Sequence, residues 1–225
     1  MPVDVETSAK LVAREERSTP YPVRATDVLW LLRAVEAEGP DREEVAAVLV
    51  NGFVWARSMK AYRGTLTDWI RSYSSTVNPR WFVGGDKFDA ELEHVPAAKR
   101  EAYIAKAERR ERVNAKRTAF SGATRAAVQK TLEGKVAFPP QATDFAAASV
   151  DAGAKGYRPL EQIIAGKNRL WSRPGAESWG GYAVILDPDA ERRVRWFAYA
   201  LGGLGVATVG AVAWWAVRRA RRRVA

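Results

Sequence analysis

Cysteine is absent from the 225 residues, and histidine occurs once, at His94. The lack of thiols excludes disulfides, zinc–thiolate sites and cysteine nucleophiles, and a single imidazole excludes a metal site built from several histidines. A Ser-His-Asp triad could use only His94 as its histidine, and His94 has no evident partner in the sequence and is expected at the surface. We therefore expect no metal and no cofactor, so that any chemistry rests on carboxylates, hydroxyls, amides, lysine or arginine.

An excess of positive charge is also lacking over most of the chain. The net charge is +10, but eight arginines and no acid follow from Arg192 onward, which leaves 28 basic and 26 acidic groups before it. A basic total raises the question of nucleic-acid binding. Here the excess surrounds an apolar run, which favours topology control and contact with anionic lipid as the role of Arg218–Arg223, and disfavours a nucleic acid as the partner.

That apolar run covers residues 196–217 and holds no charged residue. As a helix it extends roughly 33 Å, enough to cross a bilayer core of about 30 Å. Aromatic residues stand near both ends, as at two membrane interfaces, and Gly203, Ala207 and Ala211 have the spacing of a self-association motif between such helices. The alternative is a buried hairpin helix of a soluble protein, but the flanking arginines favour a single transmembrane helix.

The distribution of arginines also predicts the orientation of this helix. The basic tail, 218–225, is expected on the cytoplasmic side, which places residues 1–195 across the membrane, with 187–195 as a juxtamembrane segment. Met1–Lys10 has no apolar core and so does not have the pattern of a signal peptide. The chain is thus expected to reach the far side of a membrane without that export signal.

The remaining residues are expected to be mainly α-helical, because apolar residues recur at helical spacing between Gly and Pro breaks. Residues 1–24 are polar and contain prolines near their end, which predicts an arm or linker. The charge run in 96–117 predicts a solvated helix face rather than a nucleic-acid stripe. Helices are expected at 28–39, 41–62, 64–72, 96–117 and 122–134, a loop at 74–88, a short helix at 160–165, and a strand or buried extension at 182–186.

Glu36 and Glu38 stand at the end of the first of these helices, just before Gly39-Pro40. A carboxylate at a helix C-terminus faces the negative end of the dipole, and packing beside Trp30 or Trp55 would desolvate it, so that both effects raise its pKa. A carboxylic acid kept protonated in this way is the general acid of glycoside cleavage. The alternative is two ordinary acids at a solvated helix end.

Three short motifs resemble one family of enzymes. Glu36-Ala37-Glu38-Gly39, followed after an alanine- and valine-rich stretch by Asn51, is similar to the opening motif of the spore-cortex-lytic and phage cell-wall hydrolase family. Residues 73–81, YSSTVNPRW, and residues 141–147, QATDFAA, resemble two later motifs of its phage branch. The motifs follow one another in the family's order.

The resemblance implies a lysozyme-like helical domain at 25–186 that cleaves the MurNAc–GlcNAc bond of peptidoglycan glycan strands, as a lytic transglycosylase does. It implies that Glu36 is the catalytic acid, with Glu38 as the alternative. It also implies that four residues line the glycan cleft: Tyr73, Ser74, Asn78 and Trp81.

The chain also departs from the family's pattern. Ser75-Thr76 replace a Gln-Pro pair, and Gly180-Gly181 are not followed by the asparagine of relatives. Two alternatives therefore stay open: a catalytically inactive membrane-anchored protein of a virion, with a structural or ejection role, and a membrane-anchored nucleic-acid-binding protein. The favoured interpretation is a single-pass membrane enzyme of a phage virion or host envelope that faces the peptidoglycan during genome entry, which accounts for the absent export signal.

The apolar run makes the first prediction. Full-length protein should partition with membranes and resist extraction by alkaline carbonate, because removing a run of 22 uncharged, mostly apolar residues from lipid is unfavourable. A variant that ends at Glu191 should remain in the supernatant. Equal extraction of the two proteins would contradict a membrane anchor at 196–217.

Overall fold

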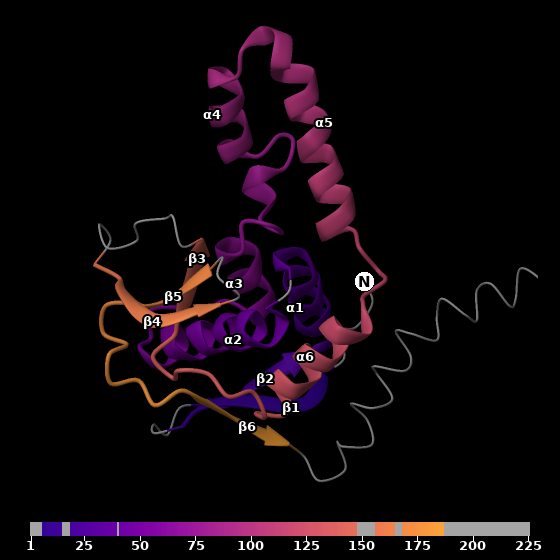
Figure 1. The fold of residues 1–225 in the computed structure, drawn as a ribbon. Helices are drawn as coiled ribbons and strands as arrows, with labels where there is room; N and C mark the ends of the chain where they lie inside the picture. The colour runs from indigo at the N-terminus through magenta and orange to yellow at the C-terminus, as the bar shows by residue number, and fades with distance from the viewer. Residues whose placement is uncertain (1–5, 15–18, 40, 148–155, 165–167, 187–225) are drawn as a thin grey trace, which may run out of the picture. The chain divides into compact units, whose positions relative to one another are not determined.

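The computed structural model describes residues 6–14, 19–39, 41–147, 156–164 and 168–186 (Figure 1). About half of the structure is helical, with six α-helices and two small antiparallel sheets among these residues. The α-helices are α1 Ala25–Glu38, α2 Arg42–Ser58, α3 Leu66–Tyr73, α4 Asp86–His94, α5 Arg100–Arg110 and α6 Gly122–Leu132. The strands are β1 Glu6–Ala13, β2 Tyr21–Arg24, β3 Asp144–Ala147, β4 Arg158–Ile164, β5 Asn168–Ser172 and β6 Tyr182–Leu186.

Helix α2 forms the centre of the core. Nearly every residue from Val45 to Ala56 is buried, as expected for a helix that is apolar on all sides. Helices α1, α3 and α6 pack against it or against one another. These four helices confirm the sequence expectations at 28–39, 41–62, 64–72 and 122–134, and Gly39, with φ of 105°, ends α1 where the Gly-Pro break predicted.

The start of α1 is fixed by a buried carboxylate, Asp27. Its side chain is fully buried and accepts hydrogen bonds from the Tyr21 hydroxyl (2.8 Å) and from the backbone N–H (2.8 Å) and hydroxyl (2.7 Å) of Thr67. The Arg24 backbone N–H donates to it as well. Since Tyr21 lies on β2 and Thr67 on α3, one ionisable side chain joins three elements.

The expected arm at 1–24 is wrong for the described residues of that segment. β1 lies between β2 and β6 in an antiparallel sheet, with Leu11 opposite Tyr21 on one side and Val184 on the other. Alternate residues of β1, namely Ala9, Leu11 and Ala13, are buried in the core. This period of two is short and made partly of alanine, so the polar surroundings concealed it. The pairing of β6 confirms the strand alternative at 182–186.

The second sheet has the order β3-β5-β4 and replaces the short helix expected at 160–165. It is joined to α2 by a buried amide, because Asn51 donates to the backbone carbonyls of Pro140 and Ala142, both at 2.7 Å. The Asn51 side-chain oxygen accepts from the Trp179 indole N–H at 2.8 Å. A Cβ on neighbouring Gly52 would lie 2.4 Å from the Thr143 carbonyl oxygen, so α2 approaches this backbone as closely as a glycine permits.

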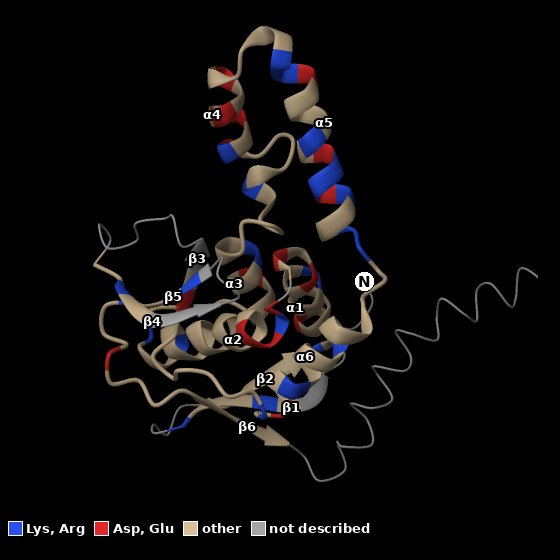
Figure 2. Ribbon diagram, in the orientation of Figure 1, with Lys and Arg blue, Asp and Glu red and all other residues tan. Residues whose placement is uncertain are grey.

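Helices α4 and α5 run antiparallel and project from the other helices (Figure 1). The loop expected at 74–88 contains a 3-10 turn, Pro79–Trp81, and ends where α4 begins at Asp86. The helix expected at 96–117 is divided into a 3-10 turn at Ala97–Lys99, α5, and a π-helical turn at Glu111–Ala115. Acids crowd α4 and both signs alternate on α5 (Figure 2), and most charged side chains of α5 are exposed, as a solvated face requires.

The segments expected at 187–195, 196–217 and 218–225 lie outside the described residues. Within the described part of the chain, no helix combines the length and the apolar character that crossing a bilayer needs.

The amide of Asn51 provides a prediction about stability. Asn51→Ala leaves two buried carbonyls and the Trp179 N–H without their partner, so the free energy of unfolding should fall by about 3 kcal/mol. Asn114→Ala is the matched control, because its half-buried amide donates one hydrogen bond, to the Thr76 carbonyl, and its loss should cost about 1 kcal/mol. Urea unfolding of both variants measures the difference. Equal, small losses would contradict the description of Asn51 as a buried junction.

Candidate functional site

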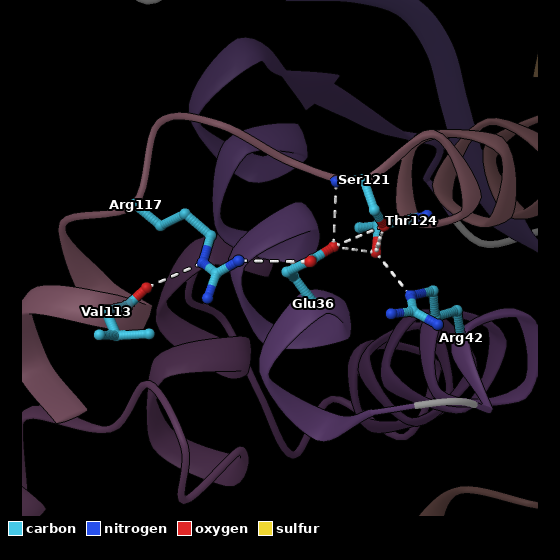
Figure 3. Close-up of polar contacts among 6 residues, drawn as sticks. All are labelled: Glu36, Arg42, Val113, Arg117, Ser121 and Thr124. Carbon is cyan, nitrogen blue, oxygen red and sulfur yellow. Dashed lines mark hydrogen bonds and ion pairs between the residues drawn. The ribbon is translucent and has the colours of Figure 1, made fainter.

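Glu36 lies in the last turn of α1 and points at the start of α6 (Figure 3). Its carboxylate accepts from the Ser121 hydroxyl at 2.9 Å, from the Ser121 backbone N–H at 3.3 Å and from the Thr124 hydroxyl. Arg117 pairs with the other oxygen at 3.3 Å. Ser121 is the N-cap of α6, so Glu36 lies where the helix dipole favours an anion.

These contacts give Glu36 the character of an ionised structural group. Burial would raise its pKa, but the hydrogen bonds from Thr124 and Ser121 and the charge of Arg117 outweigh burial, and the net pKa lies below its ordinary value of 4.5. The Arg42 guanidinium in turn donates to the Thr124 hydroxyl at 2.8 Å. Glu36 therefore links α1 to α6, and its proton is absent at neutral pH.

Glu38, two residues later, faces the other side of α1. Both the Ser74 and Thr76 hydroxyls donate to its Oε1, each at 2.9 Å. Burial raises the pKa of Glu38, and these hydrogen bonds with the charge of Arg110 offset burial only in part, so that its pKa lies above the ordinary value. The environment expected for a general acid is therefore found at Glu38, the alternative acid, and not at Glu36.

A cavity of about 270 Å³ opens beside the segment that holds Glu38. It lies between the chain after α3 and the projecting pair of helices, and Arg110, whose charge acts on Glu38, is one of its walls. Ser75, between the two residues that bind Glu38, is another. The lining residues are Ser75, Trp81, Glu91, Tyr103, Lys106, Ala107 and Arg110.

The structure separates the four residues expected to line a glycan cleft. Trp81 lines the cavity, and Ser74 is buried and holds Glu38. Asn78 caps the 3-10 turn by accepting from the Arg80 N–H at 3.0 Å and donating to the Ser72 carbonyl at 3.0 Å, which is a structural role. Tyr73 lies elsewhere, against Trp69 and the guanidinium of Arg173, with ring distances of 3.9 and 4.4 Å.

The sequence did not identify Thr76, Tyr103 or Arg110 as parts of this site. Thr76 occupies the position of a proline in the resembling motif, and its hydroxyl supplies one of the two donors to Glu38. Arg110 and Tyr103 belong to the charge-rich helix α5, where nothing in the local pattern distinguishes a side chain that faces the cavity from one that faces water. Among the described residues, no three His, Asp or Glu side chains are grouped to hold a metal ion.

Comparison with known proteins gives no match: no protein-family model, curated protein or solved structure corresponds to the chain. The family resemblance of the three motifs accordingly stays a prediction, and the geometry around Glu38 is the observation from which a function can be argued.

The opposite pKa shifts of the two glutamates predict opposite effects on stability. Glu36 stabilises the fold when ionised, so its contribution is present above pH 4.5 and is lost as the pH falls through its lowered pKa. Glu38 has a raised pKa, so its contribution is present below pH 4.5 and is lost as the pH rises through that pKa. At pH 7, Glu36→Gln should therefore lower the free energy of unfolding and Glu38→Gln should leave it unchanged or raise it.

The measurement is denaturant unfolding of wild type and both variants at pH 7 and pH 3. Each variant's difference from wild type should shrink as the pH is lowered, because protonation brings each carboxyl closer to the neutral state that glutamine mimics, and Glu36, whose pKa is lowered, should need the lower pH. A Glu36→Gln protein as stable as wild type at pH 7 would contradict the structural role given to Glu36.

Proposed function

We propose that the chain cleaves the glycan strands of peptidoglycan, with Glu38 as the general acid. One observation carries the proposal: a partly buried carboxyl with a raised pKa is held at a helix end by two hydroxyls, and Ser75, between the residues that supply them, lines a cavity with aromatic and charged walls. The order of the three sequence motifs supports it. We also propose that residues 25–186 contain a lysozyme-like domain, and that β1 and β2 extend it by pairing with β6 in one sheet.

The arrangement suits cleavage by a single carboxyl group. Protonated Glu38 donates its proton to the glycosidic oxygen as the bond from C1 to that oxygen breaks. The resulting carboxylate then accepts the proton of the 6-hydroxyl of the same MurNAc residue, whose oxygen closes onto C1. The products are a 1,6-anhydro sugar and a free 4-hydroxyl, no water is consumed, and Glu38 regains its proton.

The neighbouring side chains have roles in this step. Ser74 and Thr76 fix the carboxyl through Oε1, and the hydrogen bonds from the described residues fall on that oxygen alone. The charge of Arg110 stabilises the carboxylate that forms when the proton leaves. Trp81 and Tyr103 supply ring faces in the cavity on which sugar rings can stack, and Tyr103 is itself steadied by stacking on Phe88 with ring centroids 5.4 Å apart.

The location of the activity is also part of the proposal. An anchor at 196–217 with the basic tail Arg218–Arg223 would hold the enzyme at a membrane, in a phage virion or the host envelope, with its site toward the peptidoglycan. Delivery with the virion supplies a route across the membrane during genome entry. The inactive virion protein and the nucleic-acid-binding protein remain the competing functions.

Replacing each of the two acids by glutamine tests whether Glu38 is the general acid. Glu38→Gln keeps the shape and both accepted hydrogen bonds but removes the transferable proton, so turnover should fall by about 10²–10⁴-fold. Glu36→Gln is the matched control, two residues away on the same helix, and should keep its rate per folded molecule. The assay is turbidity loss of purified peptidoglycan by full-length protein in detergent, with melting curves for each variant and mass spectrometry for anhydro ends.

Two results would contradict this assignment. If Glu36→Gln is inactive with a wild-type melting curve while Glu38→Gln turns over, the acid is Glu36. If wild-type protein binds glycan strands without cleaving them, the inactive membrane-anchored protein is the better description.

A further inference from the structure

Two arginines stack on one half-buried tryptophan, Trp30, which lies near the middle of α1, eight residues before Glu38. The guanidinium carbon of Arg33 lies 4.7 Å from the centroid of the Trp30 ring, and that of Arg71, from α3, lies 4.8 Å from it. Bringing like charges together on one ring is unfavourable, and burial, together with the charge of Arg71, lowers the pKa of Arg33.

The described residues supply no acid to either arginine. The ion pairs of this part of the chain include neither Arg33 nor Arg71. The Arg33 Nε donates to the Arg117 carbonyl at 3.0 Å, whereas the Arg71 Nε is buried and has no hydrogen-bond partner among the residues that the structure describes. Buried polar groups normally have a partner, so an unpaired guanidinium nitrogen beside a second guanidinium points to an absent anion.

We infer that Arg33, Arg71 and Trp30 form a binding site for an oxyanion, and that its ligand is a carboxylate of the peptide stems carried by the glycan. Planar guanidinium groups match the two oxygens of a carboxylate and stack well on an indole ring, which orders them in advance. The identity of the ligand rests on the proposed glycan substrate, whereas the oxyanion site rests on the two arginines alone.

The spacing along α1 favours this source. Trp30 and Glu38 are eight residues apart on one helix, which is about 12 Å along its axis. A glycan strand long enough to occupy the Glu38 site also extends over this distance, and its peptide stems carry free carboxylates. The site would thus select strands that still bear their stems.

The test measures binding without cleavage. Full-length Glu38→Gln protein in detergent is titrated into fluorescently labelled glycan strands, either with their stems or stripped of them by an amidase, and anisotropy gives both affinities. We expect tighter binding of the stem-bearing strands. Adding Arg33→Gln or Arg71→Gln should weaken that binding about tenfold, because a charge-assisted hydrogen bond is lost, and should leave the affinity for stripped strands unchanged.

Controls separate the site from bulk charge and from misfolding. Arg63→Gln and Arg125→Gln remove the same charge from exposed positions and should keep the preference for stems. Arg71→Lys keeps the charge but loses the planar fork, so it should weaken binding of stem-bearing strands as Arg71→Gln does. Melting curves identify any variant that fails to fold, and Arg33→Gln, whose side chain reaches solvent, then carries the test.

Each outcome has one meaning. Equal affinity for both kinds of strand, or a preference that survives both arginine substitutions, overturns this inference and leaves the proposed function in place. Competition by a phosphate-rich wall polymer but not by free stem peptides would also overturn it, since the ligand would be a phosphate. If the Glu38→Gln protein with Arg33 and Arg71 unchanged binds neither kind of strand, the result would instead count against the proposed function.

Discussion

The burial of α2 on every side is the constraint on which the other elements depend. A helix that is apolar all round needs a complete shell, and that shell consists of α1, α3, α6 and both sheets. Its one buried amide, Asn51, has to be satisfied within the shell, which fixes the backbone at Pro140 and Ala142 and the indole of Trp179. The packing of α1 within this shell then determines where its two terminal acids point.

The contrast between Glu36 and Glu38 shows how much a two-residue step on a helix changes. Residues two apart face different sides, so Glu36 meets the N-terminus of α6 and Glu38 meets the hydroxyls that follow α3. One carboxyl is held ionised by donors and a cation, and the other is held toward its protonated form by burial. The same residue type, from one turn of one helix, therefore serves as a structural link and as a candidate acid.

The sequence predicted the core helices because their apolar spacing and their breaks are local signals. The end of α1 at Gly39 agrees with the expected Gly-Pro break, and α3 lies within the helix expected at 64–72. β1 was missed because its pattern is three small or medium apolar residues whose partners lie far away in sequence. The different surroundings of Glu36 and Glu38 were also beyond the sequence, since those of Glu36 depend on Ser121 and Thr124, more than 80 residues downstream, rather than on the residues next to it.

The position of β1 between β2 and β6 has a consequence for how the chain reaches this structure. β1 precedes all the described helices along the chain and β6 follows them, so the pairing of these two strands closes a loop that contains every described helix. Such long-range pairing is slow, because the entropy of closing the loop is lost before the contacts form. The edge of β1 that pairs with β6 can be filled completely only after Leu186 has left the ribosome, and until then the nascent chain carries an open sheet edge.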